Sequence, residues 1–357
     1  MNQLALLAHA ADCQCASRDV TDAAQRREDI VVAKALGLSE VAQMARIETN
    51  ARRSLVAKWD ARAAQAARSA GAVYAGGGTL AAAYAAADKA MKKWAGDVSA
   101  SYARSVVDVY KLARTAGHKK ATGKFKGSLQ YIIAETIEKA KPKGGTASGS
   151  VKLSLDAKDE RALDQLQKQQ LWWIGDTYKG VAPTIREAVQ PKVLEGLSRK
   201  VGGEMVRAGV EARLKDFKIP DGFHGTSKSY FEGLAANAVT SARVNGQLGS
   251  FARLGVTTYT LVNPMDTRTS DICAELNGTE FKVADAAAQL DKLFNAKTPD
   301  AFKSIKPWLS TDKLLSLASR GSSALAREGQ MFPPFHFRCR TTVDVATESL
   351  SFSALED

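Results

Sequence analysis

Apolar residues recur every three or four positions between residues 80 and 109, and this run sets the architecture more firmly than any other stretch of the sequence. Its members are Leu80, Tyr84, Ala87, Met91, Trp94, Val98, Tyr102, Val106 and Val109. The spacing is close to that of a coiled-coil seam and predicts one long helix with a continuous apolar face. Such a face is usually buried in a core or against a partner, and only rarely lines a cofactor site.

A second helical pattern precedes this run. Its apolar positions fall near one face of a helix, and three glycines at 76–78 separate it from the next segment; the positions are Val41, Met44, Ile47, Leu55 and Trp59. Aromatic residues make up only 7% of the 357 residues and alanine is frequent, which favours closely packed helices. We therefore expect a mainly α protein with long helices in the N-terminal two thirds and a C-terminal α+β domain.

Glycine and serine dominate residues 144–150, which follow a Lys-Pro-Lys sequence and predict a linker. Helices are expected beyond it, around Leu163 and Leu166 with the Trp172-Trp173 pair, and along Val193, Leu197, Val201 and Met205. The predicted regions are an N-terminal helical region 1–143, a linker 144–150, a middle helical region 151–224, an α+β domain 225–346 and a tail 347–357.

The predicted α+β domain begins with a helix over residues 230–254. The β-branched segment 256–262 is the best strand in the sequence. Asn277-Gly278 favours a tight turn with positive backbone φ, leading into a partner strand at 279–283. Further helices are expected at 284–294, 300–305 and 311–318, and a closing strand near 340–345.

Two groups of chemically distinctive residues lie near the two ends of this domain. The first group consists of Asp266, Arg268, Cys273 and Asn277-Gly278, and the second consists of His336, Arg338, Cys339 and Arg340. Because the groups are far apart in the sequence, only folding can bring them together. We expect them to form two halves of one small site.

The two groups resemble the C-terminal domain of the phage head morphogenesis family, the minor head proteins typified by the F protein of phage Mu. In that family an Asp-x-Arg-Thr, a Cys and an Asn/Asp-Gly turn are followed later by a His-x-x-Cys-Arg element. The resemblance covers residues 225–346. It implies a minor capsid protein of a tailed phage, located in the virion inside the head near the portal, after assembly in the host cytoplasm. It also implies portal protein, capsid proteins and packaged double-stranded DNA as partners.

The sequence departs from the family pattern at two positions. Many relatives carry a Cys-x-x-Cys in the first motif and a Cys-Arg-Cys in the second, whereas Ser270 and Thr341 stand at the positions of the extra cysteines here. Loss of one cysteine from each motif is expected if those two would have been partners. Cys273 and Cys339 are then the remaining pair.

Cys273, His336 and Cys339 supply two sulfurs and an imidazole, which are ligands that zinc prefers. Three ligands are one short of a closed tetrahedral site, and His224 or Asp266 could be the fourth. A buried set of this kind would be a structural zinc site. The alternatives are two buried thiols in contact, a disulfide formed in an oxidising medium, or a catalytic centre. We therefore predict no required cofactor, with zinc as an open possibility.

Asp266 could also form a charge-assisted network with Arg268, Arg338 and Arg340, because a guanidinium can hold a carboxylate through two parallel hydrogen bonds. This network is the role that we expect for these charges. Two alternatives remain open: the arginines could face a phosphate, or Asp266 could cap a helix that begins near Thr267.

The formal net charge is +12, which suggests a polyanionic partner such as DNA. The clearest basic cluster contains no acidic residue and consists of Lys111, Arg114, Lys119, Lys120, Lys124 and Lys126. A solvated helix face is the alternative explanation for this cluster. Few aromatic residues lie nearby, so any DNA contact is expected to involve phosphates, independently of base sequence.

Several other classes are disfavoured by the sequence. Four cysteines in a chain of this length do not form a disulfide framework, and the N-terminus lacks the basic residues of a signal peptide. The uncharged stretch 69–87 is too rich in Gly and Ala to favour a membrane. No phosphate-binding loop or nucleophile elbow is present, so we do not expect an enzyme. The remaining alternatives are a phage-encoded metal-dependent enzyme or toxin that uses Cys273, His336 and Cys339, and a generic DNA-binding protein.

Overall fold

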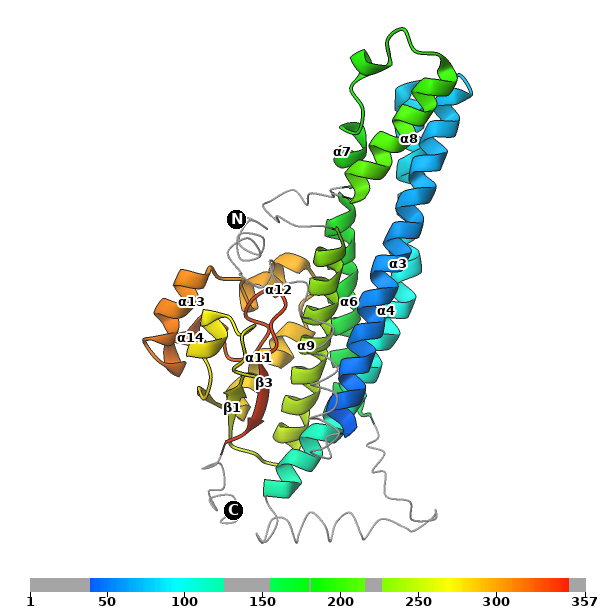
Figure 1. Cartoon of the computed structure of the whole chain (residues 1–357). Helices are drawn as coiled ribbons and strands as arrows, with labels where there is room; N and C mark the ends of the chain where they lie inside the picture. The colour runs from blue at the N-terminus through cyan, green and yellow to red at the C-terminus, as the bar shows by residue number, and fades with distance from the viewer. Residues whose placement is uncertain (1–38, 125–154, 180, 216–226, 347–357) are drawn as a thin grey trace, which may run out of the picture.

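The computed structural model describes residues 39–124, 155–179, 181–215 and 227–346. Long helices form an arm, and a small α+β lobe lies beside it (Figure 1). The elements of the arm are α3 (Ser39–Ala75), α4 (Leu80–Lys124), α6 (Ala157–Lys179), α7 (Val181–Arg186), the 3-10 helix η2 (Pro191–Leu194), α8 (Arg199–Lys215) and α9 (Ser227–Arg253). The linker predicted at 144–150, the tail and residues 1–38 lie outside the described residues.

Helices α3 and α4 form a long antiparallel hairpin, which confirms the two helices predicted from the apolar patterns. The predicted glycine break lies at the tip of the arm, where Gly77 adopts a φ of 94° that L-residues rarely tolerate. The centre of the hairpin buries Trp59 and Trp94 edge to face, with ring centroids 5.2 Å apart. Phe231 of α9 completes this aromatic group at 4.8 and 5.0 Å from the two indoles.

Helix α9 lies between the hairpin and the lobe (Figure 1) and packs closely on α4. A Cβ atom at Gly246 of α9 would lie 2.7 Å from the carbonyl oxygen of Tyr110, and one at Gly117 of α4 would lie 2.9 Å from Cα of Gln247. The two helix backbones therefore approach at both contacts more closely than side chains would allow. This approach fixes how the lobe is attached to the arm.

A buried ion-pair network joins α4, α6 and α9. Asp159, which is 1% exposed, lies 3.0 Å from Nε of Arg114 and 2.9 Å from Nη2 of Arg253. It also accepts a 2.7 Å hydrogen bond from the hydroxyl of Tyr110, while Arg114 donates to Ser250 Oγ. Arg114 was predicted as a DNA contact, and this prediction is wrong because its guanidinium is buried and neutralised inside the arm.

The lobe contains a three-stranded antiparallel sheet in the order β2–β1–β3. Its strands are β1 (Thr258–Val262), β2 (Glu280–Lys282) and β3 (Thr342–Val345). Tyr259 of β1 pairs with Phe281 on one side and Val345 on the other, and these side chains are buried in the lobe core. The predicted strands and the Asn-Gly turn, with Gly278 at a φ of 80°, are confirmed.

Five short helices complete the lobe, namely α10 (Asp271–Glu275), α11 (Val283–Phe294), α12 (Pro299–Ile305), α13 (Thr311–Ala318) and α14 (Ser322–Arg327). Three of them, α11 to α13, were predicted. Helices α10 and α14 were not predicted, because they span only five and six residues and are too short to show a helical period. The predicted mainly α protein with a C-terminal α+β part is therefore confirmed.

The helix predicted along Val193, Leu197, Val201 and Met205 is only partly correct. The chain forms η2 first, and α8 begins at Arg199. All four side chains are 37–49% exposed. Val201 and Met205 face solvent because α8 packs through a face that contains Val206, Val210 and Leu214. The tip of the arm therefore carries apolar side chains that no part of the described structure covers.

No described helix combines the length and the apolar character needed to cross a bilayer.

Candidate functional site

The two motifs meet at the junction of β1, α10 and the segment that precedes β3. Ser270 caps α10 and accepts a hydrogen bond from the backbone N–H of Cys273, which fixes that cysteine in the first turn. The second motif is held by α9, where Thr240 donates to the carbonyl of Cys339 and Arg243 donates to the carbonyls of Arg340 and Thr341. The prediction that folding would bring the two halves together is thus met by the described geometry.

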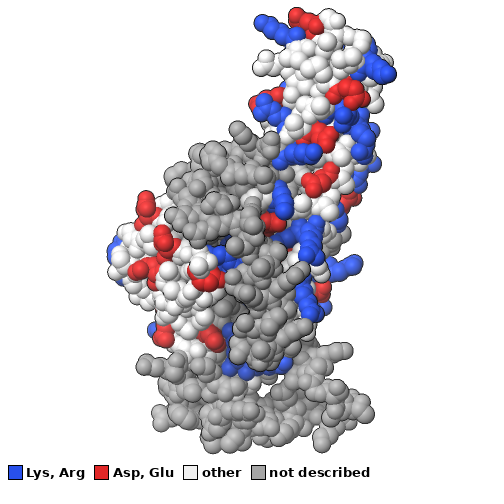
Figure 2. Space-filling view, viewed as in Figure 1, with Lys and Arg blue, Asp and Glu red and all other residues white. Residues whose placement is uncertain are grey.

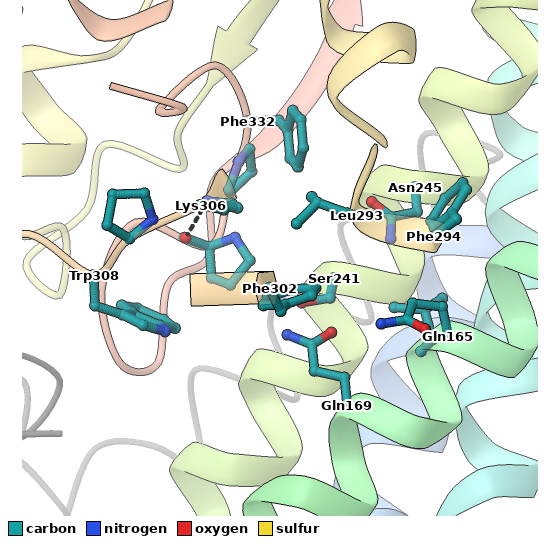
Figure 3. A pocket seen from close by; sticks show the side chains of 14 residues that line it. Gln165, Gln169, Ser241, Asn245, Leu293, Phe294, Phe302, Lys306, Trp308 and Phe332 are labelled. Atoms are coloured by element: carbon teal, nitrogen blue, oxygen red, sulfur yellow. Dashed lines mark hydrogen bonds between the residues drawn. The ribbon is translucent and has the colours of Figure 1, made fainter. Parts of the chain in front are cut away.

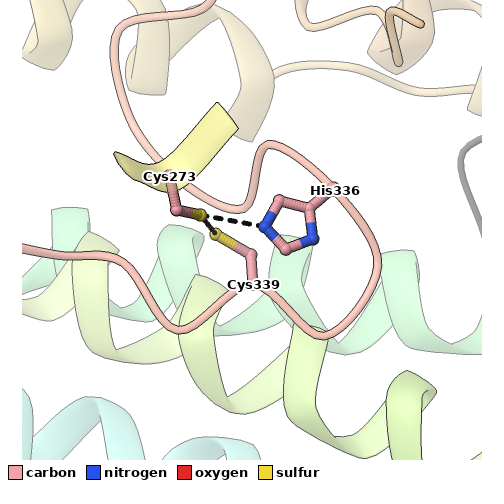
Figure 4. Close-up of side chains that lie close together, drawn as sticks. All are labelled: Cys273, His336 and Cys339. Atoms are coloured by element: carbon pink, nitrogen blue, oxygen red, sulfur yellow. Dashed lines mark hydrogen bonds between the residues drawn. The ribbon is translucent and has the colours of Figure 1, made fainter. Parts of the chain in front are cut away.

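Cys273, His336 and Cys339 converge at the centre of the site (Figure 4). Their ligand atoms all lie within 4.8 Å of one another. Cys273 Sγ lies 2.9 Å from His336 Nε2 and 3.9 Å from Cys339 Sγ. All three residues are at most 4% exposed. The two cysteines are free thiols in this structure, since a disulfide would bring the sulfurs to about 2.05 Å.

The pKa values of the two cysteines are shifted in opposite directions. The hydrogen bond with Cys339, together with burial, raises the pKa of Cys273. Burial also acts to raise the pKa of Cys339, but the hydrogen bond from Cys273 and the neighbouring His336 hold it well below its usual range. Contact between the two buried sulfurs therefore contributes to both pKa shifts.

Two hydroxyl groups stand where many relatives carry cysteines. Ser270 Oγ lies 3.0 Å from His336 Nε2. Thr341 Oγ1 lies 3.2 Å from Cys273 Sγ and 3.3 Å from Cys339 Sγ, and it donates a 2.5 Å hydrogen bond to Asn263 Oδ1. Both positions therefore belong to the site itself, which the sequence alone did not reveal.

Asp266 joins the first motif to the second through Arg340. The guanidinium donates from Nη1 to one carboxylate oxygen at 2.8 Å and from Nη2 to the other at 2.5 Å. Arg268 lies 3.6 Å from the same carboxylate and donates its backbone N–H to it. The hydrogen bonds from Arg340 hold the pKa of Asp266 far below its usual range. The expected network therefore exists for these three residues.

Arg338 does not join this network. Its guanidinium bonds to the carbonyl and hydroxyl of Ser229 and lies 3.6 Å from Glu232, both on α9. Its backbone adopts a φ of 61° and donates to Asn237 Oδ1. Its predicted pairing with Asp266 is wrong because this turn directs the side chain toward α9.

Asp266 was also considered as a fourth metal ligand or a helix cap, but among the described residues it does not belong to the Cys273, His336 and Cys339 cluster. Asn277 Oδ1 accepts the backbone N–H of Asn263 and so ties the turn to β1. Asp266 bonds within the turn of residues 266–269, whereas α10 begins later, at Asp271. The helix-cap alternative for Asp266 is therefore wrong. His224, the other suggested fourth ligand, lies outside the described residues.

Lys306 lies near the site in a pocket between the lobe and helices α6 and α9 (Figure 3). Its ammonium donates to the carbonyl of Pro334 at 3.0 Å and lies over the rings of Phe332 and Phe335. Burial lowers the pKa of Lys306 to about 8. Lys306 and Arg243 were not predicted from the sequence, because neither lies in a recognisable motif.

The residues predicted to contact DNA are dispersed. Lys111 and Lys119 are exposed on α4, whereas Lys120 is half-buried and lies 3.6 Å from Asp344. The side chain of Lys124 and the whole of Lys126 lie outside the described residues. On the visible face of the arm, Lys and Arg alternate with Asp and Glu (Figure 2). The visible described surface therefore has no continuous basic stripe.

The fold and the two-part site agree with the resemblance drawn from the two motifs. Consistent with this, the family described as Phage Mu protein F like protein matches residues 174–344, a segment that contains both motifs. The C-terminal region of the chain is thus similar to the Phage Mu F-like family, as its motifs indicated, and the match begins upstream of the expected boundary at 225. No curated protein and no solved structure matches the chain.

Proposed function

We propose that this chain is a minor capsid protein of a tailed phage that binds the portal inside the head and contacts packaged DNA during assembly. The Phage Mu F-like match over residues 174–344 is the observation that carries this proposal. The match indicates head morphogenesis, and portal and DNA binding are the finer parts of the proposal.

The exposed apolar tip of the arm supports a role in protein binding. We define the apolar tip as Val193, Leu197, Val201 and Met205, which are all exposed. These four are all but one of the exposed large apolar side chains in the described structure, and the other is Met265 in the lobe. Exposed apolar groups that gather in one region are typical of a protein–protein interface. We assign the portal protein as the partner of this tip.

A pull-down with the portal protein of the same phage tests this assignment. The double substitution Val201→Gln and Met205→Gln is expected to weaken capture by about tenfold or more, since burial of each side chain contributes about 1.5–3 kcal/mol. Met265→Gln is the matched control, because Met265 is even more exposed at 55% but lies far along the chain from the tip. Equal capture of the tip variant and the wild-type chain would contradict the assignment.

The alternative of a metal-dependent enzyme receives less support from the geometry. Catalysis requires that a substrate reach the metal, but Cys273, His336 and Cys339 are all buried, and Thr240 of α9 contacts the backbone of Cys339. A structural role, in which the three side chains join the two motifs, fits this burial better. Loss of an enzymatic activity in His336→Ala, in a protein that still folds, would favour the enzyme instead.

A further inference from the structure

We propose that Cys273, His336 and Cys339 bind one zinc ion, which fastens α10 to the segment 336–341, and that Thr341 stands at the fourth position. The inference goes beyond the proposed function, because neither portal binding nor DNA binding requires a metal.

The positions of the ligand atoms fit a tetrahedral zinc ion. With Zn–S bonds of about 2.3 Å, two sulfurs on one tetrahedron lie about 3.8 Å apart, and the sulfurs of Cys273 and Cys339 lie 3.9 Å apart. The separation of Cys273 Sγ and His336 Nε2 is 2.9 Å, so the imidazole would move outward by about 0.6 Å to reach zinc-ligand spacing. His336 lies in the loop between α14 and β3, and a movement of this size is small for a side chain in a loop.

The imidazole is already oriented as a ligand. His336 Nδ1 lies 2.7 Å from the carbonyl oxygen of Phe337, and since a carbonyl only accepts, the proton resides on Nδ1. Nε2 is the ring nitrogen that faces Cys273 Sγ, and in the neutral ring its lone pair is available to a metal. A hydrogen bond from the second ring nitrogen to a backbone carbonyl is the usual support of a zinc-bound histidine.

The backbone also holds His336 and Cys339 in a shared turn. The N–H of Cys339 donates to the carbonyl of His336, and Arg338 between them adopts a φ of 61°. A bulky L-residue at positive φ carries strain that the surrounding structure must offset. Asn237 and Ser229 of α9 bind the backbone and side chain of Arg338 and maintain this turn. The strained turn directs both ligand atoms to one point.

The chemistry of the ligands selects zinc among the common divalent ions. Two sulfurs and an imidazole suit zinc, whereas magnesium and calcium require oxygen ligands. Two thiolates neutralise the double charge of the ion, so the bound form places no net charge in this buried region.

Thr341 defines the fourth position. Its hydroxyl is near both sulfurs, at 3.2 and 3.3 Å, and the residue is fully buried. Asn263 accepts the hydroxyl proton, which leaves an oxygen lone pair for the ion or for a bound water. A neutral hydroxyl is a weaker zinc ligand than a thiolate, so this site is expected to bind zinc less tightly than a site with three cysteines.

Metal analysis of the purified full-length chain tests the proposal. After incubation with zinc and removal of excess metal, about one zinc ion per chain is expected. Cobalt in place of zinc is expected to give a thiolate charge-transfer band and tetrahedral visible bands. Both signals should disappear in Cys273→Ser and Cys339→Ser. They should persist when the chain's other cysteines, Cys13 and Cys15, are both changed to serine.

Two gentler substitutions keep the test informative if the cysteine variants do not fold. Thr341→Val is nearly isosteric and is expected to weaken zinc binding by about 10–100-fold, as measured by competition with a chelating dye. Thr341→Cys is expected to strengthen binding by about tenfold or more, because it adds a thiolate at the fourth position.

Three results would overturn the proposal. The first is a folded chain that retains less than about 0.1 zinc per molecule and gives no cobalt bands. The second is an internal Cys273–Cys339 disulfide, detected by intact mass, in protein purified without oxidant. The third is zinc affinity that does not change in either Thr341 variant. Since these measurements involve neither portal nor DNA, their failure would leave the proposed function untouched.

Discussion

Asp266 is the single side chain that most directly links the two motifs. Its carboxylate accepts two hydrogen bonds from Arg340 and one from the backbone of Arg268. The sequence predicted this pairing because the charges lie in motifs that had to meet. It could not predict that Arg338 turns toward α9, because that outcome depends on the backbone turn at residue 338.

Asp266→Asn is expected to lower the free energy of unfolding at pH 7 by about 2 kcal/mol, because hydrogen bonds to a charged group are lost. The pKa of Asp266 is lowered in the folded state, so the contribution of its carboxylate is complete above its unfolded pKa of about 3.9. That contribution disappears as the pH falls toward the folded pKa. Urea denaturation at a series of pH values should therefore show the difference between variant and wild type narrowing below about pH 4.

Asp108→Asn serves as the control, since Asp108 is exposed on α4. It should leave the unfolding free energy within about 0.5 kcal/mol of the wild type. A constant difference between Asp266→Asn and wild type from pH 7 to pH 2.5 would contradict the role assigned to this carboxylate.

At the scale of elements, the helices of the arm were the most predictable part of the chain. Their apolar stripes are long, and in α4 the predicted residues from Ala87 to Val109 are all buried. The buried ion pair between Arg114 and Asp159 was not predictable. Asp159 lies on α6, and the sequence alone does not indicate which face of α4 is covered by α6. Likewise, spacing alone could not tell that the stripe from Val193 to Met205 faces solvent.

Gly246→Ala tests the close approach of α4 and α9. The added methyl would lie 2.7 Å from the carbonyl oxygen of Tyr110 and 2.9 Å from Cβ of Ala113, so the helices must separate. We expect a loss of about 1–3 kcal/mol in unfolding free energy, measured by denaturant titration.

Gly96→Ala is the matched control on α4, because the added methyl would meet no described atom within 4 Å apart from its own helical turn. Alanine favours a helix over glycine, so this variant should gain about 0.5–1 kcal/mol. If both alanine variants are stabilised, the two helices do not depend on this glycine for their approach.

At the scale of the whole molecule, the arm and the lobe are not separate bodies. Helix α9 contributes Phe231 to the aromatic core of the arm and Phe251 to the core of the lobe. The boundary predicted at residue 225, where the family resemblance begins, lies immediately before this helix. The resemblance could not show that α9 serves both cores, because the apolar residues of α9 lie on more than one face.

The net charge of +12 also belongs to the whole molecule. Lys111→Gln with Lys119→Gln is expected to weaken binding to double-stranded DNA at low salt. It should also reduce the slope of log affinity against log salt by about 1–2. Fluorescence anisotropy with a labelled duplex measures both quantities.

Lys168→Gln with Lys313→Gln removes the same amount of charge from exposed positions on α6 and α13. This control should retain most of the affinity. Equal weakening by both pairs would show that overall charge alone governs binding, and would remove α4 as the contact surface.

Because the two motifs contact each other, the chain between them forms a closed loop. Helices α11 to α14 lie between the first motif and the second in the chain, so contact between the motifs holds the two ends of this segment together. The entropic contribution to the free energy of closing such a loop grows only slowly with loop length, by about 0.6 kcal/mol for each doubling. Exposed turns between these helices are therefore the places where relatives and engineered variants can carry insertions without loss of the contact between the two motifs.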